Sequence, residues 1–115
     1  MYKIIDEGDV KVYVPEEEKV SRSLPVFFNP EMKLNRDIAL YIINKLKPER
    51  CLDAMAGTGV RALRILKETS CKNVVANDLN PEAAKLIKRN AELNKLDLDV
   101  HNKDLNVLLR EEQWF

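Results

Sequence analysis

A glycine turn, followed about 20 residues later by an aspartate, limits this chain to few folds. Gly57 and Gly59 lie in the segment 51–62, between one apolar run and the next. Asp78 follows the second apolar run and precedes Asn80-Pro81. Glycines between a strand and a helix allow a tight turn and a close approach of backbone to a ligand. The spacing therefore predicts a β-α-β unit with parallel strands.

Apolar periodicity predicts the other elements. Residues 2–14 alternate around Gly8, which indicates a β-hairpin, and residues 16–25 are expected to form a polar loop. Asn35 is expected to cap a helix that Pro48 ends. Further strands are expected at 51–55, 73–77 and 96–101, and further helices at 58–68, 81–94 and 106–112.

Strands that alternate with helices pair in parallel through right-handed crossovers. The predicted fold class is α/β: a partial Rossmann-like fold with three parallel strands and their helices, preceded by an N-terminal hairpin and helix. We expect residues 1–35 to form the hairpin and the segment leading into the fold, and residues 36–115 to form half of the Rossmann-like domain. Trp114-Phe115 resembles the approach to a fourth strand.

Composition excludes several classes of protein. The chain has 115 residues, enough for one domain, with 19 basic and 19 acidic side chains, so no overall basic excess points to nucleic acid. No apolar run reaches the roughly 18 residues of a membrane span, and no signal pattern opens the chain, so a cytoplasmic location is expected. Cys51 and Cys71 form no CxxC pair, which predicts reduced thiols and no metal site. His101 is expected to be a strand residue without a chemical role.

Three chemistry-bearing positions follow three successive strands. Gly57, Asp78 and Asp104 each follow a strand, and ligands of open parallel sheets bind outside the carboxyl ends of their strands. Asp78 is expected to accept hydrogen bonds from the two hydroxyls of a ribose, and Asp104 from an adenine amino group. The alternative is that the glycine turn merely connects a strand to a helix, and that Asp104 is an exposed loop carboxylate.

Two ligands fit this pattern. Gly57-x-Gly59-x-x-Ala62 satisfies the dinucleotide fingerprint, which favours a nicotinamide-dependent oxidoreductase fragment. Asp53 at the end of the first strand, and Asn80-Pro81 after Asp78, instead resemble the class I S-adenosylmethionine methyltransferases that act on RNA. A non-catalytic Rossmann-like binding module is a third alternative.

Three segments together carry a more specific resemblance. They are Phe27-Phe28-Asn29-Pro30-Glu31-Met32-Lys33-Leu34-Asn35-Arg36-Asp37, Leu52-Asp53-Ala54-Met55-Ala56-Gly57-Thr58-Gly59-Val60-Arg61-Ala62 and Ala76-Asn77-Asp78-Leu79-Asn80-Pro81. The chain resembles the tRNA (guanine-26,N2)-dimethyltransferase family of archaeal type. The resemblance implies S-adenosyl-L-methionine as cofactor, tRNA as partner, and transfer of methyl groups to the exocyclic amine of a guanine.

The resemblance also implies roles for single residues. Arg36 and Arg61 are expected at the methionine carboxylate of the cofactor, Asp78 at its ribose and Asp104 at its adenine. The full set of residues expected at the cofactor is Arg36, Asp53, Ala54, Gly57, Thr58, Gly59, Arg61, Asp78, Leu79, Asp104 and Leu105. The family's catalytic Asp-Pro-Phe/Pro motif is expected past Phe115, so no catalytic residue and no metal ligand is assigned. The 115 residues alone are expected to be inactive and to require the missing C-terminal part of the enzyme.

Overall fold

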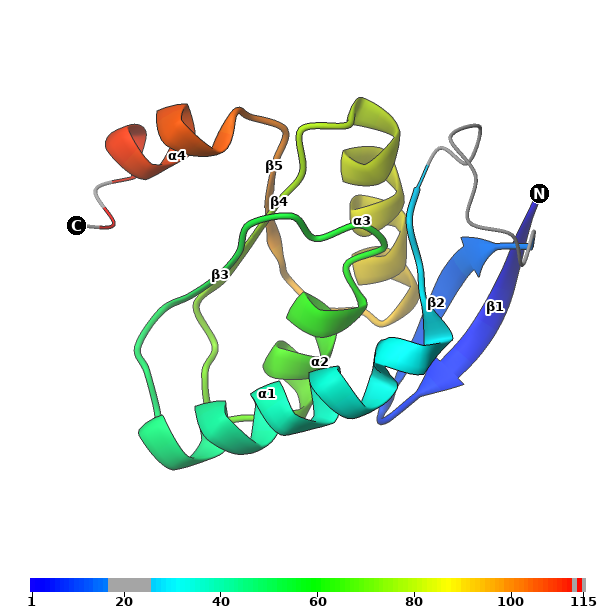
Figure 1. The fold of residues 1–115 in the computed structure, drawn as a ribbon, viewed down its shortest axis with the longest axis horizontal. Helices are drawn as coiled ribbons and strands as arrows, with labels where there is room; N and C mark the ends of the chain where they lie inside the picture. The colour runs from blue at the N-terminus through cyan, green and yellow to red at the C-terminus, as the bar shows by residue number, and fades with distance from the viewer. Residues whose placement is uncertain (17–25, 113, 115) are drawn as a thin grey trace.

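Two sheets and four α-helices make up the structure, a computed structural model that describes residues 1–16, 26–112 and 114 (Figure 1). The antiparallel hairpin and the parallel sheet are separate. In chain order the elements are β1 (Tyr2–Glu7), β2 (Val10–Pro15), a 3-10 turn (Pro30–Met32), α1 (Lys33–Leu46), β3 (Cys51–Asp53), α2 (Val60–Glu68), β4 (Val74–Asn77), α3 (Pro81–Leu93), β5 (Asp99–His101) and α4 (Leu105–Glu111).

The predicted topology is confirmed. Strands β3, β4 and β5 pair in parallel in that order, with Leu52 opposite Val75 and Ala76 opposite Val100. The hairpin also forms as predicted around Gly8. In the described part of the chain β3 pairs with β4 only and so lies at one edge of the sheet.

Two predicted boundaries were wrong. Helix α1 begins at Lys33 with Met32 in the cap position, so Asn35 lies inside the helix and does not cap it. Asn29 provides a side-chain cap, but for the preceding 3-10 turn. Strand β5 begins at Asp99 because the chain first turns through Lys95, at φ 55°, where the Leu96 N–H returns to the carbonyl of Ala91.

The predicted loop at 16–25 lies mostly outside the described residues. The predicted approach to a fourth strand can be followed only at Trp114, which lies in no strand and has the Arg50 guanidinium over its ring at 3.7 Å. Within the described residues, none of the helices has the length and apolar character that crossing a membrane requires.

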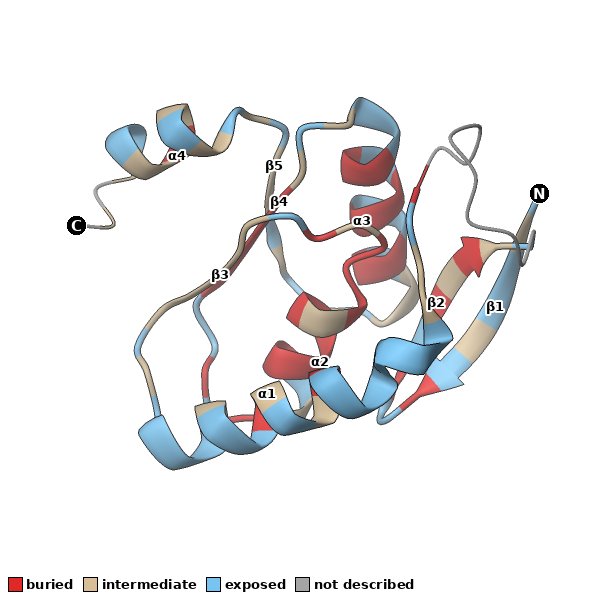
Figure 2. Cartoon of the chain, viewed as in Figure 1, coloured by how far each residue is buried: buried red, intermediate tan, exposed pale blue. Residues whose placement is uncertain are grey.

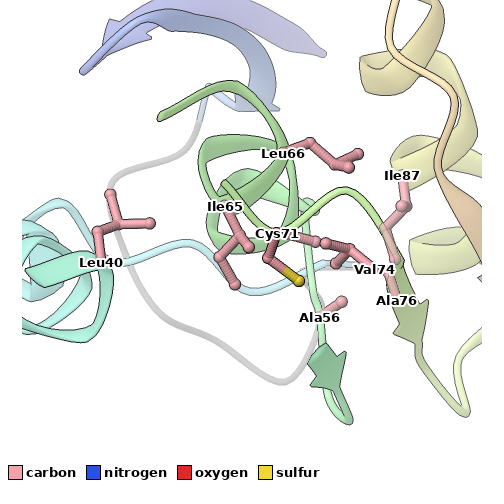
Figure 3. Packing of buried hydrophobic residues seen from close by; sticks show 9 residues of the cluster. Leu40, Ala56, Ile65, Leu66, Cys71, Val74, Ala76 and Ile87 are labelled. Carbon is pink, nitrogen blue, oxygen red and sulfur yellow. The ribbon is translucent and has the colours of Figure 1, made fainter. Parts of the chain in front are cut away.

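The core forms where the helices meet the parallel sheet. Figure 3 shows Leu66 of α2 and Ile87 of α3 beside Val74 and Ala76 of β4, with Leu40 of α1 on the side of Ile65. A second cluster joins the valines of β2 to α2 and α3. The buried faces of the helices and of β4 can be followed in Figure 2, where the outer face of α1 is largely exposed.

Two asparagines of α3 attach the hairpin to this core. The Asn90 side chain accepts from the N–H of Tyr13 at 2.7 Å and donates to its carbonyl at 3.2 Å. Asn94, one turn later, does the same to Lys11 at 2.9 and 2.7 Å. Asn90 also donates to the carbonyl of Thr58 in the glycine turn at 2.8 Å. The one-turn spacing of the asparagines thus serves to hold β2.

We predict that Asn90→Ala lowers the free energy of unfolding by about 2–4 kcal/mol. The substitution leaves the backbone groups of Tyr13 and Thr58 that bind the Asn90 amide without a hydrogen-bond partner. Asn90 is fully buried, so water cannot replace its amide. Asn94→Ala is the matched control, with an expected loss of about 1 kcal/mol because its partners reach solvent. Urea unfolding of both variants measures the difference, and equal losses would contradict this account.

Candidate functional site

The loops that follow the three parallel strands are tied together at one edge of the sheet. The Gly57 N–H donates to Oδ2 of Asp78 at 2.9 Å, and the Asp78 N–H donates to the carbonyl of His101 at 3.2 Å. Asn77, which is 1% exposed, donates to the carbonyls of Ala54 at 3.4 Å and Lys103 at 3.0 Å. The loops after β3, β4 and β5 therefore converge, as the sequence predicted, but sequence reasoning missed the residue that joins them.

Asp78 has the geometry of a ligand acceptor at this edge. It is half-buried, and its two carboxylate oxygens each take one backbone N–H, from Gly57 and from Asn80 at 3.0 Å. Each oxygen keeps a second lone-pair direction for a further donor. The hydrogen bond from Gly57 also shows how an aspartate 21 residues away fixes the glycine turn.

Both glycines of the turn are required by their backbone. Gly57 has φ 58° and Gly59 has φ 85°, in the left-handed region that other residues rarely adopt. A Cβ at Gly57 would lie 2.9 Å from the Phe27 carbonyl oxygen, and one at Gly59 would lie 3.0 Å from Ile87. Thr58 between them is 2% exposed, and its hydroxyl accepts the Val60 N–H at 3.3 Å.

A cavity of about 120 Å³ opens beside this turn. It is large enough for a group the size of an amino acid, and too small for a whole nucleotide. It is lined by Phe27, Phe28, Asn29, Met32, Arg36, Asp53, Met55, Ala56, Gly57, Thr58, Val60 and Arg61. Five of the predicted site residues thus share one cavity, whereas the aromatic wall before α1 was not assigned to the site.

Arg36 of α1 is a buried residue of this cavity. Its guanidinium donates to both carboxylate oxygens of Glu7, at 2.8 and 2.6 Å, and stacks 5.0 Å from the ring centre of Phe28. A third hydrogen bond reaches the Asn29 carbonyl at 3.3 Å. Within the described residues its Nη1 makes no hydrogen bond, which leaves two N–H groups for a ligand.

Glu7 is shared with a second buried arginine. Arg64 of α2 donates to Glu7 at 3.1 Å, to Asp37 at 2.7 Å and to Glu68 at 2.8 Å. Burial disfavours the charged form of Glu7, but the hydrogen bonds from Arg36 and Arg64 outweigh it, so its pKa is lowered. Glu7 therefore stays ionised at neutral pH and ties β1 to α1 and α2. Nothing in the alternating pattern of the hairpin signalled this role.

Arg61 and Asp53 also line this cavity. Arg61 donates to Oδ1 of Asn35 at 2.9 Å, so the Asn35 side chain contacts α2 instead of capping α1. Asp53 is half-buried overall, but its Oδ2 is fully buried and has no hydrogen-bond partner among the described residues. Burial raises the pKa of Asp53 to about 6, against the lowering effect of Arg61. A buried carboxylate oxygen without a donor is suited to a cationic or hydrogen-bonding ligand group.

A second, wider cavity meets the first at these residues. It measures about 460 Å³ and lies between β3, α1 and α2, with Asp53, Met55 and Arg61 common to both cavities. Cys51 lines it, and burial raises the pKa of this thiol to about 12, so it is no nucleophile at neutral pH. Both cysteines are free, as predicted.

The remaining predicted residues lie outside the small cavity. Asp104 is the cap of α4: its Oδ1 accepts the N–H groups of Asn106 at 3.0 Å and Val107 at 3.4 Å. Leu105 is half-buried at the start of that helix, Leu79 is 69% exposed after β4, and Ala54 follows β3 with its carbonyl on Asn77. They lie in the loops that follow the three parallel strands, but the cavity does not include them.

Comparison with solved structures defines the class of fold. The structure of Trm1 from Pyrococcus horikoshii in complex with S-adenosyl-L-methionine matches with a TM-score of 0.84 and 33% identity, over 95% of this chain and 32% of that one. An S-adenosylmethionine-dependent methyltransferase from Agrobacterium tumefaciens shares the fold, with a TM-score of 0.74 at 18% identity, over 97% of this chain and 35% of that one. The chain thus has the fold of S-adenosylmethionine-dependent methyltransferases.

The family follows from sequence. The model of the N2,N2-dimethylguanosine tRNA methyltransferases matches residues 8–115, and the chain belongs to this family. The tRNA (guanine(26)-N(2))-dimethyltransferase of Methanosphaera stadtmanae is 42% identical over 96% of this chain and 30% of its own length. The tRNA (guanine(26)-N(2)/guanine(27)-N(2))-dimethyltransferase of Aquifex aeolicus is 40% identical over 98% of this chain and 31% of its own length. The chain therefore spans about a third of the relatives it matches.

The raised pKa of Asp53 predicts a pH dependence of stability. The native state keeps the Asp53 proton up to about pH 6, whereas the unfolded state keeps it only up to about pH 3.8. The contribution of Asp53 to the free energy of unfolding therefore falls as the pH rises between these two values. Asp53→Asn should therefore stabilise the ligand-free chain above pH 6 by about 1–3 kcal/mol relative to wild type, with little gain below pH 4. Thermal unfolding from pH 3.5 to 8 measures this.

The exposed Asp97 provides the control, since Asp97→Asn should change stability little at any pH. A stability difference between wild type and Asp53→Asn that does not vary with pH would contradict the buried, protonatable state of Asp53.

Proposed function

We propose that this chain is the cofactor-binding part of an S-adenosylmethionine-dependent tRNA methyltransferase that modifies N2 of the guanine at position 26. Membership of the family supports the reaction, and the names of the relatives support the position. The proposed partner is tRNA and the proposed location is the cytoplasm. The methyl acceptor site and the catalytic groups are proposed to lie in the part of the enzyme that this chain does not include.

The cavity residues suit the amino-acid end of the cofactor. The two free N–H groups on Nη1 of Arg36, and the guanidinium of Arg61, offer donors to a carboxylate. The unpartnered Oδ2 of Asp53 suits the ammonium group of the same ligand. Two cations and one anion that line a space of about 120 Å³ match a zwitterion.

The strand ends suit the adenosine end. Asp78 keeps acceptor capacity for the ribose hydroxyls and lies beside Gly57, whose N–H it accepts. Leu79 is exposed enough to cover a base, and Oδ2 of Asp104, which accepts no hydrogen bond from the described residues, would accept from an adenine amino group. Ala54, Thr58, Gly59 and Leu105 would frame the ligand through their backbone.

The chemistry that such a cofactor supplies is an electrophilic methyl group on a sulfonium. The residues of this chain would contribute to transfer by holding that group in line with the incoming amine, an effect of orientation. Residues 36–115 are proposed to carry this cofactor-binding half, with residues 1–35 bracing it through Glu7.

Equilibrium dialysis of the purified chain against S-adenosylmethionine and against NADH tests the proposal. We expect saturable binding of S-adenosylmethionine and weaker binding of NADH, because the cavity is built for a zwitterion and not for a pyrophosphate. Tighter binding of NADH would favour the hypothesis of a nicotinamide-dependent oxidoreductase fragment. Binding of neither ligand would favour the hypothesis of a non-catalytic Rossmann-like binding module.

Asp78→Ala should weaken S-adenosylmethionine binding about 10–100-fold, the loss expected for hydrogen bonds to a charged acceptor. Since Asp78 also holds the glycine turn, a second readout is needed. Wild type should prefer adenosine to 2′,3′-dideoxyadenosine, and Asp78→Ala should lose that preference. Asp97→Ala is the control, and an unchanged preference for the ribose hydroxyls would remove Asp78 from this role.

A further inference from the structure

A polar cluster with no part in the proposed cofactor site lies on β5, at the opposite edge of the parallel sheet from β3. It consists of Asp99 and His101 of β5 and of Glu112, the residue that follows α4. Nε2 of His101 lies 3.1 Å from Oδ1 of Asp99 and 3.3 Å from Oε1 of Glu112. Each residue offers one possible ligand atom, and these three atoms lie within 4.8 Å of one another.

The histidine nitrogen is buried but not hydrogen-bonded. Nε2 of His101 has almost no contact with solvent, and it makes no hydrogen bond with any described residue, although two carboxylates flank it. Neither contact therefore has the alignment of an N–H donating to an oxygen. A ring nitrogen placed between two carboxylates without such an alignment is the arrangement expected of a lone pair directed at a shared ion.

The backbone holds all three groups in place. Asp99 and His101 are two residues apart on one strand, so their side chains lie on the same face. The carbonyl of His101 is fixed by the N–H of Asp78. Helix α4 brings Glu112 back to β5, with Asp104 capping its start and Leu108 fully buried beneath it.

We propose that Asp99, His101 and Glu112 form a binding site for a divalent transition-metal ion of the Zn²⁺ class. Around a tetrahedral ion with bonds of about 2.0–2.2 Å, neighbouring donor atoms lie about 3.3–3.5 Å apart. The measured separations of 3.1 and 3.3 Å are close to these values. One imidazole nitrogen and two carboxylate oxygens, with an open fourth position, are a donor set for such ions and not for magnesium or calcium.

Charge and access agree with this assignment. Two carboxylates around a neutral imidazole carry two negative charges, which a divalent ion balances and a proton on the ring balances only in part. The nearby Lys103 is engaged by Glu111, so its ammonium does not fill the cluster. The side chain of Asp99 is 59% exposed, which gives an ion a path from solvent.

The single histidine of the chain makes the test direct. The probe is Zn²⁺, added to the metal-free chain at neutral pH, and the readout is the proton NMR signals of the His101 ring. We expect a saturable 1:1 shift of these signals. Asp99→Asn and Glu112→Gln should each raise the dissociation constant about tenfold or more, the loss typical of disturbing a metal site.

Asp97→Asn is the matched control, because Asp97 is an exposed aspartate two residues from Asp99 and outside the cluster. It should bind Zn²⁺ as wild type does. Ring signals that respond to pH but not to Zn²⁺ would overturn the proposal and identify the cluster as an ion pair held by a proton. A Zn²⁺ response that survives in both ligand variants would also overturn it.

Co²⁺ distinguishes binding at the proposed site from binding at the cysteine thiols, because its absorption spectrum differs between thiolate ligands and nitrogen or oxygen ligands. A nitrogen-oxygen spectrum supports the site, and a thiolate spectrum would move the ion to Cys51 or Cys71 and overturn it.

Discussion

The position of the candidate site depends on one buried carboxylate. Glu7 is 4% exposed and binds Arg36 of α1 and Arg64 of α2 at the same time. Two guanidinium groups compensate the cost of burying it, and removing one partner of such a group typically costs about 3–5 kcal/mol. The hairpin, which shares no strand pairing with the parallel sheet, thereby fixes the orientation of an arginine in the cavity wall.

The triplet Asn35-Arg36-Asp37 shows how a short motif serves three contacts. Successive residues of α1 reach Arg61, Glu7 and Arg64, so the same turn of helix braces both arginines of the cavity and the helix that follows the glycine turn. Asp37 divides its oxygens between Lys33 and Arg64, whose hydrogen bonds lower its pKa. The motif thus has a structural explanation that is independent of any ligand.

The strands, their parallel pairing and the glycine turn could be predicted because the local pattern of residues indicates them. Gly57, Gly59 and Asp78 follow from the backbone conformations and strand ends that the pattern requires. The partners of Glu7 and Asn77 could not be predicted, since their contacts are 23 to 57 residues distant and depend on how the elements pack. Asp104 was placed at the correct strand end, but its capping of α4 competes with a ligand for the same carboxylate and is invisible to spacing.

The amides of Asn90 and Asn94 also have a consequence for self-association. They occupy the outward-facing peptide groups of Tyr13 and Lys11, which a neighbouring molecule would need in order to add a strand to β2. Two side chains of α3 thus take the hydrogen bonds that a further strand would make, and they prevent another molecule from adding a strand at this edge of β2. Edge strands are often protected by charged residues or prolines. Protection by the side chains of a helix needs no such residue in the strand, so the strand can keep its regular conformation.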